Sequence, residues 1–237
     1  MCCQSVIYVS NVYGHGYLIS PIARQARCKN NPKNSIWWPT DGTGIQDLDC
    51  RAAFQYVKNR GSDPTYQFTQ LNEFAVLIPQ YQSGYSALTQ AVPNNLCSAG
   101  ASTPSAQFGD KSGMSIATKW TPTQYKIGST SNTSMDITVT FCATATHNPS
   151  FWEFYITKQG VNTATKVLTW NDFEFFQSIN NVAPTTGTWA GCTASKAYIM
   201  KIKVPVRLTA ATLLARWQRI DSVGECFINC SDIQMIV

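Results

Sequence analysis

The sequence predicts a mainly β fold, an antiparallel β-sandwich interrupted early by a long, partly helical insertion. Short segments of alternating apolar and polar residues fill the second half of the chain, and this alternation is typical of strands that bury one face. Turn residues separate them at the spacing found in sandwiches of the immunoglobulin and fibronectin III type. Composition agrees, because 12% aromatic and only 13% charged residues exclude a disordered chain and a coiled coil.

The first expected strand is His15–Ser20, and Pro21 ends it because proline cannot donate to a strand ladder. A loop is predicted over Asn30–Gly44, where prolines and glycines surround the pair Trp37 and Trp38. These two indoles are expected to be exposed.

A helix is predicted over Asp47–Asn59, ending near Gly61. Its apolar residues Leu48, Ala52 and Tyr56 recur at helical spacing and indicate one face. The stretch 62–113 that follows is irregular and rich in Gln, Pro, Gly and Ser. A long stretch of this kind inside a domain is usually functional or disordered.

Five further strands are expected in the second half, each with one buried face. They are Met135–Cys142, Phe151–Lys158, Ala197–Val206, Thr212–Ile220 and Cys226–Ile236. Together with the first strand they predict a single domain over residues 15–237.

Charge and hydropathy restrict the partners. The net charge of +5 is scattered, and the longest basic cluster is too thin for a nucleic-acid footprint. No apolar run approaches the roughly 20 residues that a membrane span needs. A surface poor in charge and rich in aromatic, Thr, Ser and Asn residues favours an uncharged polymer such as a polysaccharide.

The nine cysteines are dispersed and form no CxxC pair, and two histidines cannot complete several zinc sites. Dispersed cysteines of this kind predict disulfides and therefore an oxidising compartment, which implies secretion. A glycosylation sequon at Asn132 is compatible with that compartment.

Residues 1–14 are interpreted as a short or truncated signal peptide, because Val12-Tyr13-Gly14 resembles a signal-peptidase site. The alternative is an ordinary N-terminal strand. Removal of this leader would make His15 the first residue of the mature chain and leave an odd number of cysteines.

His15 and His147 are the two histidines of the chain. An N-terminal histidine offers its α-amino group and ring Nδ1 to one metal, and a second imidazole would complete a three-nitrogen site that suits Cu(II). The α-amino pKa of about 7.7–8 allows deprotonation near neutral pH. The alternative is two unrelated histidines, since the sequence does not show whether these distant segments meet.

Several long segments resemble one protein family. HGYLISPIARQARC (15–28) resembles the mature start of chitin-binding type 4 proteins, the lytic polysaccharide monooxygenases of auxiliary-activity family ten. The resemblance continues to the C-terminus and is greatest to the viral branch, the entomopoxvirus fusolins and their baculovirus spindle-like relatives. The segments that carry it are WWPTDGTGIQDLDCRAAFQ, FGDKSGM, TATHNPSFWEFYITK and RWQRIDSVGECFINC.

The resemblance implies one copper ion held by a histidine brace of His15 and His147. Phe227 matches the family's axial aromatic residue, and Ala145 matches the small residue that shapes access from the other side. Ala145 and His147 would face the same side if both lay in one strand. The implied activity is oxidative cleavage of crystalline chitin with an external electron donor and O2 or H2O2.

The family also implies an acidic or amide group near the copper, for which Glu73 and Gln218 are candidates, and a flat chitin-binding face, for which Tyr17, Trp37 and Trp38 are candidates. Partial burial of these aromatics is the alternative. The resemblance favours a disulfide between Cys28 and Cys50. Cys226 stands where relatives carry glycine and is the expected free thiol.

Two other functions fit the same resemblance. One is a non-catalytic chitin-binding protein, and the other is a structural glycoprotein that assembles into viral spindles and helps to disrupt the chitin-containing insect gut lining. The implied location is the secretory pathway of the infected cell, with deposition in spindles or occlusion bodies.

Overall fold

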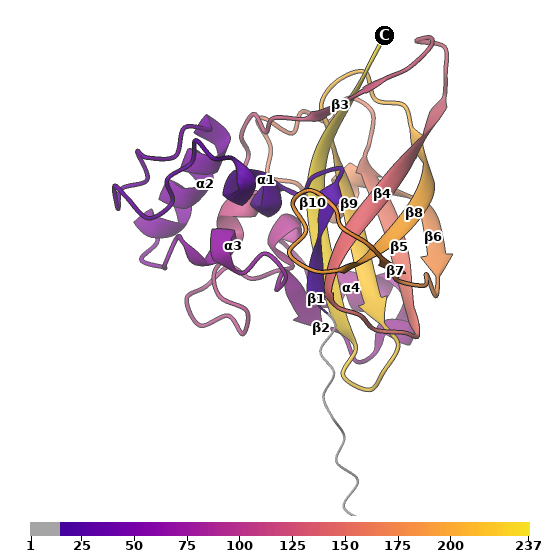
Figure 1. Cartoon of the computed structure of the whole chain (residues 1–237), viewed down its shortest axis with the longest axis horizontal. Helices are drawn as coiled ribbons and strands as arrows, with labels where there is room; N and C mark the ends of the chain where they lie inside the picture. Colours follow the sequence, from indigo (N-terminus) through magenta and orange to yellow (C-terminus); the bar gives the residue numbers. More distant parts are fainter. Residues whose placement is uncertain (1–14) are drawn as a thin grey trace, which may run out of the picture.

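The computed structural model describes residues 15–237 and contains two packed β-sheets with helices to one side (Figure 1). The predicted leader, residues 1–14, lies outside the described residues. The predicted β-sandwich is confirmed. One sheet has the strand order β1 (His15–Ser20), β4 (Ser134–Ala145), β8 (Lys196–Pro205) and β7 (Thr185–Thr186), and all its pairs are antiparallel.

The second sheet is larger and contains one parallel pair. Its order is β2 (Ala75–Leu77), β10 (Glu225–Ile236), β9 (Ala211–Arg219), β5 (Ser150–Thr157) and β6 (Phe173–Asn180), with β3 (Thr123–Lys126) running parallel to β10. The two sheets enclose an aromatic core. Trp152 stacks on Trp217 with ring centroids 5.5 Å apart, and Phe141 and Tyr198 pack against both indoles.

Alternation predicted β8 correctly, because its buried and exposed residues alternate from Tyr198 to Val204 after one irregular step. The same expectation was wrong for β9 and β10, which are buried on both faces. The reason is the insertion, whose helix α4 (Tyr85–Ala91) and 3-10 turn Leu96–Ser98 cover the outer face of these strands with apolar residues.

The insertion forms a second, mostly helical body beside the sandwich, drawn in indigo and purple in Figure 1. Its helices α1 (Arg24–Asn30), α2 (Leu48–Asn59) and α3 (Tyr66–Thr69) share a small apolar core. Helix α1 was not expected from the sequence. The irregular stretch 62–113 contains α3, β2, α4 and short 3-10 turns joined by loops.

Helix α2 forms where it was predicted but presents the opposite face to the core. Leu48 is 74% exposed and Tyr56 is 39% exposed. The buried face instead carries Ala53, Phe54 and Val57. Cys50 lies on this face in a disulfide, which fixes the rotation of the helix, and the spacing of apolar residues did not include it.

The described residues form three disulfides. Cys28–Cys50 joins α1 to α2 within the insertion, Cys97–Cys230 joins the insertion to β10, and Cys142–Cys192 joins β4 to the loop before β8. Cys226 is buried and unbridged. Within residues 15–237, no helix is long and apolar enough to cross a membrane.

Candidate metal centre

The pairing of β1 with β4 brings the two histidines to one end of the sandwich. His15 lies opposite Ala145, the last residue of β4, and His147 follows two residues later. Strand β4 ends at Ala145, so the condition that Ala145 and His147 share one strand is not met, and His147 lies in the loop that follows. The loop instead holds His147 through Tyr198, whose hydroxyl accepts from the His147 N–H at 2.9 Å and donates to its carbonyl at 3.2 Å.

The guanidinium of Arg219 lowers the pKa of both histidine rings. Burial lowers the pKa of His15, the Glu73 carboxylate opposes this, and Arg219 lowers that pKa further. Burial and Arg219 also lower the pKa of His147, against the opposing charge of Asp221. Both imidazoles are therefore neutral near neutral pH, and a neutral imidazole offers a lone pair to a metal.

Arg219 belongs to an ion-pair network at the rim of the site. It donates to Asp221 at 2.6 Å and to the buried Glu225 at 2.7 Å. Asp221 Oδ2 lies 3.2 Å from Nε2 of His147. The sequence analysis missed Arg219 and Asp221, although both stand in the segment RWQRIDSVGECFINC. Two charged residues at the end of an apolar strand were the available signal.

Phe227 forms an apolar floor under the site. Its fully buried ring contacts His15 edge-on with centroids 6.1 Å apart and packs on Trp217 at 5.2 Å. A phenyl ring has no lone pair, so this side of His15 offers no further ligand. The structure therefore places Phe227 beside His15, and Ala145 lies opposite His15 across the β1–β4 pair.

The two candidates for an acidic or amide group differ in position. The Glu73 carboxylate lies close enough to His15 to raise its pKa. Gln218 does not belong to the site, which corrects the sequence expectation. Its side chain is fully buried, donates to the carbonyls of Arg219 and Gly224, and accepts from Arg216.

The residues present fit a nitrogen-bound metal. Nδ1 of His147 is buried and has no hydrogen-bond partner within residues 15–237, which is unusual for a polar atom. The described chain holds no cluster of three or more His, Cys, Asp or Glu side chains, so the donor set here consists of two imidazoles. Two neutral nitrogen ligands suit copper better than magnesium or calcium, which prefer oxygen.

The aromatic candidates separate into two groups. Tyr17 is only 2% exposed and donates to the Gly191 carbonyl, so its assignment to a flat binding face was wrong. Trp37 and Trp38 are 63% and 71% exposed. They lie in the loop between α1 and α2. Asn132 is exposed in the loop between β3 and β4.

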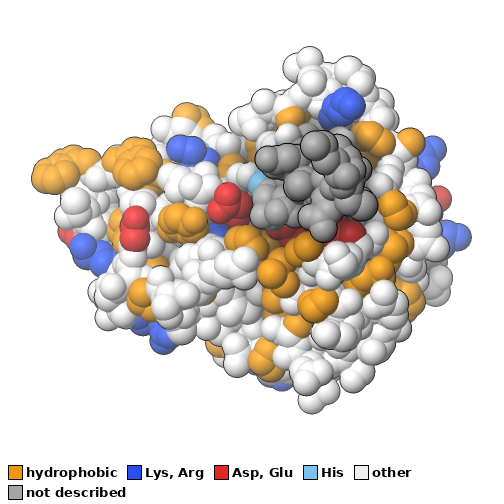
Figure 2. Space-filling view, turned by 90° about the horizontal axis from the view of Figure 1, so that it is seen from below, with side chains coloured by type: hydrophobic (Ala, Val, Ile, Leu, Met, Phe, Trp, Pro, Cys, Tyr) orange, Lys and Arg blue, Asp and Glu red, His pale blue; other side chains and the backbone are white. Residues whose placement is uncertain are grey.

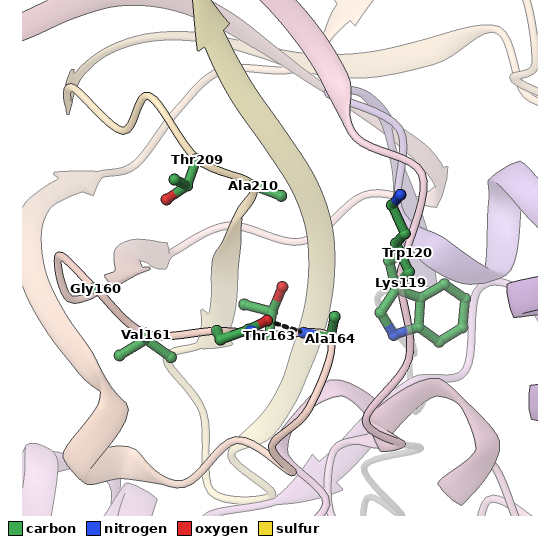
Figure 3. Close-up of a pocket in the computed structure, with 9 residues that line it drawn as sticks. Lys119, Trp120, Gly160, Val161, Thr163, Ala164, Thr209 and Ala210 are labelled. Carbon is green, nitrogen blue, oxygen red and sulfur yellow. Dashed lines mark hydrogen bonds between the residues drawn. The ribbon is translucent and has the colours of Figure 1, made fainter.

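Figure 2 shows the histidine end of the molecule, where a histidine reaches the surface close to acidic and apolar side chains. A cavity of about 370 Å³ lies elsewhere, beside Trp120, Gly160 and Thr209 (Figure 3). Its loops follow the far end of β5, the strand that begins near His147. This cavity is therefore not part of the candidate centre.

Comparison with known proteins finds one matching family and several similar viral proteins. A family model described as lytic polysaccharide mono-oxygenase, cellulose-degrading, matches residues 15–233. The chain is 41% identical to spindolin of Heliothis armigera entomopoxvirus over 244 residues, covering 97% of this chain and 68% of the relative. It also resembles the fusolin of Wiseana spp entomopoxvirus spindles, with a TM-score of 0.87, 39% identity, and 94% and 82% of the two chains covered.

Two similar structures contain a metal. An entomopoxvirus fusolin that crystallises in vivo into viral spindles was solved with zinc, and it matches with a TM-score of 0.85, 37% identity, and 94% and 76% coverage. A cellulose-active mono-oxygenase of this kind was solved with copper, with a TM-score of 0.67, 25% identity, and 93% and 98% coverage.

Proposed function

Because the chain belongs to the lytic polysaccharide mono-oxygenase family, we propose that it is a copper-dependent oxidoreductase that cleaves crystalline chitin. The observation that carries the proposal is the β1–β4 register, which sets His15 opposite the end of the strand that leads to His147. The metal-bound relatives support a metal at this fold, and the donor set of two imidazoles supports copper.

The proposal requires His15 to begin the mature chain. The family match starts at this residue, and the predicted leader ends just before it. A free α-amino group binds a metal together with Nδ1 of the same residue, whereas a peptide nitrogen resists deprotonation near neutral pH. Removal of residues 1–14 would therefore complete a centre of three nitrogen ligands.

The protein's own residues prepare these ligands. Burial and Arg219 keep both imidazoles neutral, and Asp221 lies within hydrogen-bond distance of His147. Phe227 keeps a strong ligand away from one side of His15. A copper ion held by His15 and His147 would supply redox chemistry, with an external electron donor as the reductant and O2 or H2O2 as the oxidant, for oxidation of the C–H bond next to the glycosidic bond.

Chitin as the substrate is a finer proposal than the family. The low charge of the chain suits a neutral polymer, and the exposed rings of Trp37 and Trp38 can stack on sugar faces. The family description names cellulose, so the two polymers are to be compared directly. Oxidised N-acetylglucosamine oligomers from chitin support the proposal, whereas products from cellulose alone would contradict it.

The decisive variant is His147→Ala in protein that begins at His15. We expect loss of tight Cu(II) binding in calorimetry and loss of oxidised products in mass spectrometry, because one of two imidazole ligands is gone. Thr144→Ala, an exposed position near the end of β4, is the matched control and should behave like the unmodified protein. Equal product yields from both variants would refute the copper assignment.

Assembly into viral spindles is a second proposed role, favoured by the similarity to fusolin from spindles. The three disulfides suit the secretory pathway, where such bodies would form and from which they would reach the chitin-containing gut lining. Expression of His147→Ala in insect cells separates the two roles. Spindles that lack chitin-cleaving activity would show that assembly does not depend on the metal site.

A further inference from the structure

The cavity beside Trp120 lies at the far end of the sandwich from the histidines and has the size of a ligand site (Figure 3). Its volume of about 370 Å³ falls at the lower end of the range for small-molecule sites, roughly 300–1,000 Å³. Three loops form it: the segment before β3, the turn after β5 and the segment before β9. A cavity of this size holds one small ring.

One polar group in the wall of the cavity lacks a partner. Thr163 is only 6% exposed and lines the cavity, and its side chain points into the space between the three loops (Figure 3). Its hydroxyl forms no hydrogen bond with any residue in the described range 15–237. Native proteins rarely keep a buried hydroxyl without a partner, because its lost hydration is then not replaced. A ligand in the cavity would supply the missing partner.

The rest of the wall combines small apolar surfaces with neutral polar groups. Val161, Ala164 and Ala210 contribute methyl groups. The hydroxyl of Thr209 and the side-chain amide of Asn162 lie beside them. The amide oxygen of Asn162 accepts from the Ala164 N–H at 3.0 Å, which leaves the amide nitrogen as a donor for a ligand.

This wall chemistry selects among ligand classes. A cation would need a carboxylate, and none of the described residues that line the cavity carries one. A fatty chain would leave the Thr163 hydroxyl unpaired. An anion would lose its hydration against methyl groups, and its only charged partner would be Lys119, which is exposed and screened by water. A neutral ring that carries hydroxyls, an amide and a methyl group matches every part of the wall.

The wall is held in place without a ligand. The Trp120 indole donates to the Ile116 carbonyl at 3.3 Å, and the Arg24 guanidinium lies 4.5 Å from the Trp120 ring centroid. Arg24 is itself fixed by a buried salt bridge to Asp232 at 2.7 Å. A preformed cavity binds a small ligand without the entropic cost of ordering its own walls.

We propose that this cavity binds one N-acetylhexosamine unit. The Thr163 hydroxyl and the Asn162 amide pair with the acetamido carbonyl and the sugar hydroxyls, and the methyl groups of Ala164 and Ala210 contact the acetyl methyl. The site shares no residue with the candidate metal centre, so it stands apart from the proposed function. If that function also holds, the protein would contact its acetylated polymer at two opposite ends.

The first test titrates N,N′-diacetylchitobiose into the metal-free protein and follows the backbone amide signals by NMR. We expect shifts at Thr163, Ala164 and Ala210, with a Kd on the order of 1 mM for a ligand of this size. Cellobiose, which lacks the acetamido groups, should bind severalfold more weakly. Equal binding of the two sugars, or tighter binding of glucuronate through Lys119, would overturn the proposal.

Thr163→Val keeps the shape of the side chain and removes the hydroxyl. Affinity for the acetylated sugar should fall roughly fivefold to tenfold, as for loss of one hydrogen bond. The free energy of unfolding of the unliganded protein should not fall, because the hydroxyl has no partner to lose. Thr185→Val, at an exposed threonine of β7, is the matched control and should change neither quantity. Unchanged affinity in Thr163→Val would contradict the assignment.

Two further variants separate this site from the candidate metal centre. Ala210→Phe places a larger side chain in the cavity from a half-buried position and should abolish the shifts at Thr163. His147→Ala removes a proposed metal ligand and should leave these shifts intact. Shifts confined to residues around His15 would place the sugar at the histidine end and overturn the proposal. Failure of the unmodified protein to oxidise chitin would reject the proposed function alone.

Discussion

Arg219 is the residue on which the electrostatics of the centre depend. It balances two carboxylates, Asp221 and Glu225, and lowers the pKa of both histidines. Glu225 is 1% exposed, and burial raises its pKa even with Arg219 beside it. The ion pair with Arg219 therefore opposes the effect of burial on the pKa of Glu225.

Replacing Arg219 by Met should cost about 3–5 kcal/mol of the free energy of unfolding at neutral pH, because it leaves Glu225 buried without its partner. The folded-state pKa of Glu225 then rises further, so the folded variant binds a proton that the unfolded chain releases. Its stability falls as pH increases, and the loss relative to the unmodified protein is smaller at pH 5 than at pH 7. Urea denaturation at the two pH values measures this, and an equal loss at both would contradict it.

Burial of Lys111 should make the free energy of unfolding depend on pH in the alkaline range. Its pKa is about 8 in the folded protein against an ordinary 10.5, so between these values the unfolded chain holds more protons. Stability therefore rises with pH in this window, by up to about 3 kcal/mol. The free energy of unfolding of the unmodified protein should increase relative to Lys111→Met from pH 8 to 10.5. Parallel curves would show that burial does not shift this lysine.

At the scale of elements, α2 shows what periodicity can and cannot predict. The helix itself followed from the pattern, but its buried face did not, since apolar residues occupy both faces. The Cys28–Cys50 bridge and the core of the insertion select the face that carries Phe54. Local spacing contains no information about a bridge to another helix.

Substitutions on the two faces of α2 should lower the free energy of unfolding by different amounts. Phe54→Ala removes a 1% exposed ring and should lower the free energy of unfolding by about 3–5 kcal/mol. Leu48→Ala, at a 74% exposed position, should change it by less than about 0.5 kcal/mol. Chemical denaturation of the two variants decides the orientation, and a larger loss for Leu48→Ala would restore the face expected from the sequence.

The β-strands also have some features that the sequence predicts and others that it does not. The sandwich and the positions of its later strands were predictable because turns and alternation are local. Burial of β9 and β10 on both faces was not predictable, since a segment more than a hundred residues earlier covers them. For the candidate site, His15 and His147 stood out as the two histidines of the sequence, and the family resemblance added Phe227. Arg219 and Asp221 did not stand out, because their importance depends on which residues they contact.

At the scale of the whole molecule, the disulfides close loops of very different length. Cys97–Cys230 joins residues 133 positions apart, whereas Cys28–Cys50 joins residues 22 apart. In the chain-entropy model the longer closure contributes about 5 kcal/mol and the shorter about 3 kcal/mol. The Cys97–Cys230 bridge also attaches the insertion to β10, the strand that carries Phe227.

Variants in which both cysteines of one bridge are replaced by alanine should therefore lose stability in the order of these loop lengths. Loss of Cys97–Cys230 should lower the free energy of unfolding more than loss of Cys28–Cys50, by roughly 1–2 kcal/mol. Guanidinium denaturation under non-reducing conditions provides the comparison. The reverse order would mean that packing in the insertion core outweighs chain entropy.

The side chain of Asn229 on β10 accepts from the N–H of Leu18 on β1, across 211 positions of sequence. During translation β1 is synthesised long before β10. His15 is therefore made well before Phe227, which lies beside it in the folded protein. A nascent chain can hold neither the floor nor the rim of the centre. A metal ion at the proposed centre would therefore bind to the finished protein, and the compartment in which β10 docks would decide which metal ion the protein first meets.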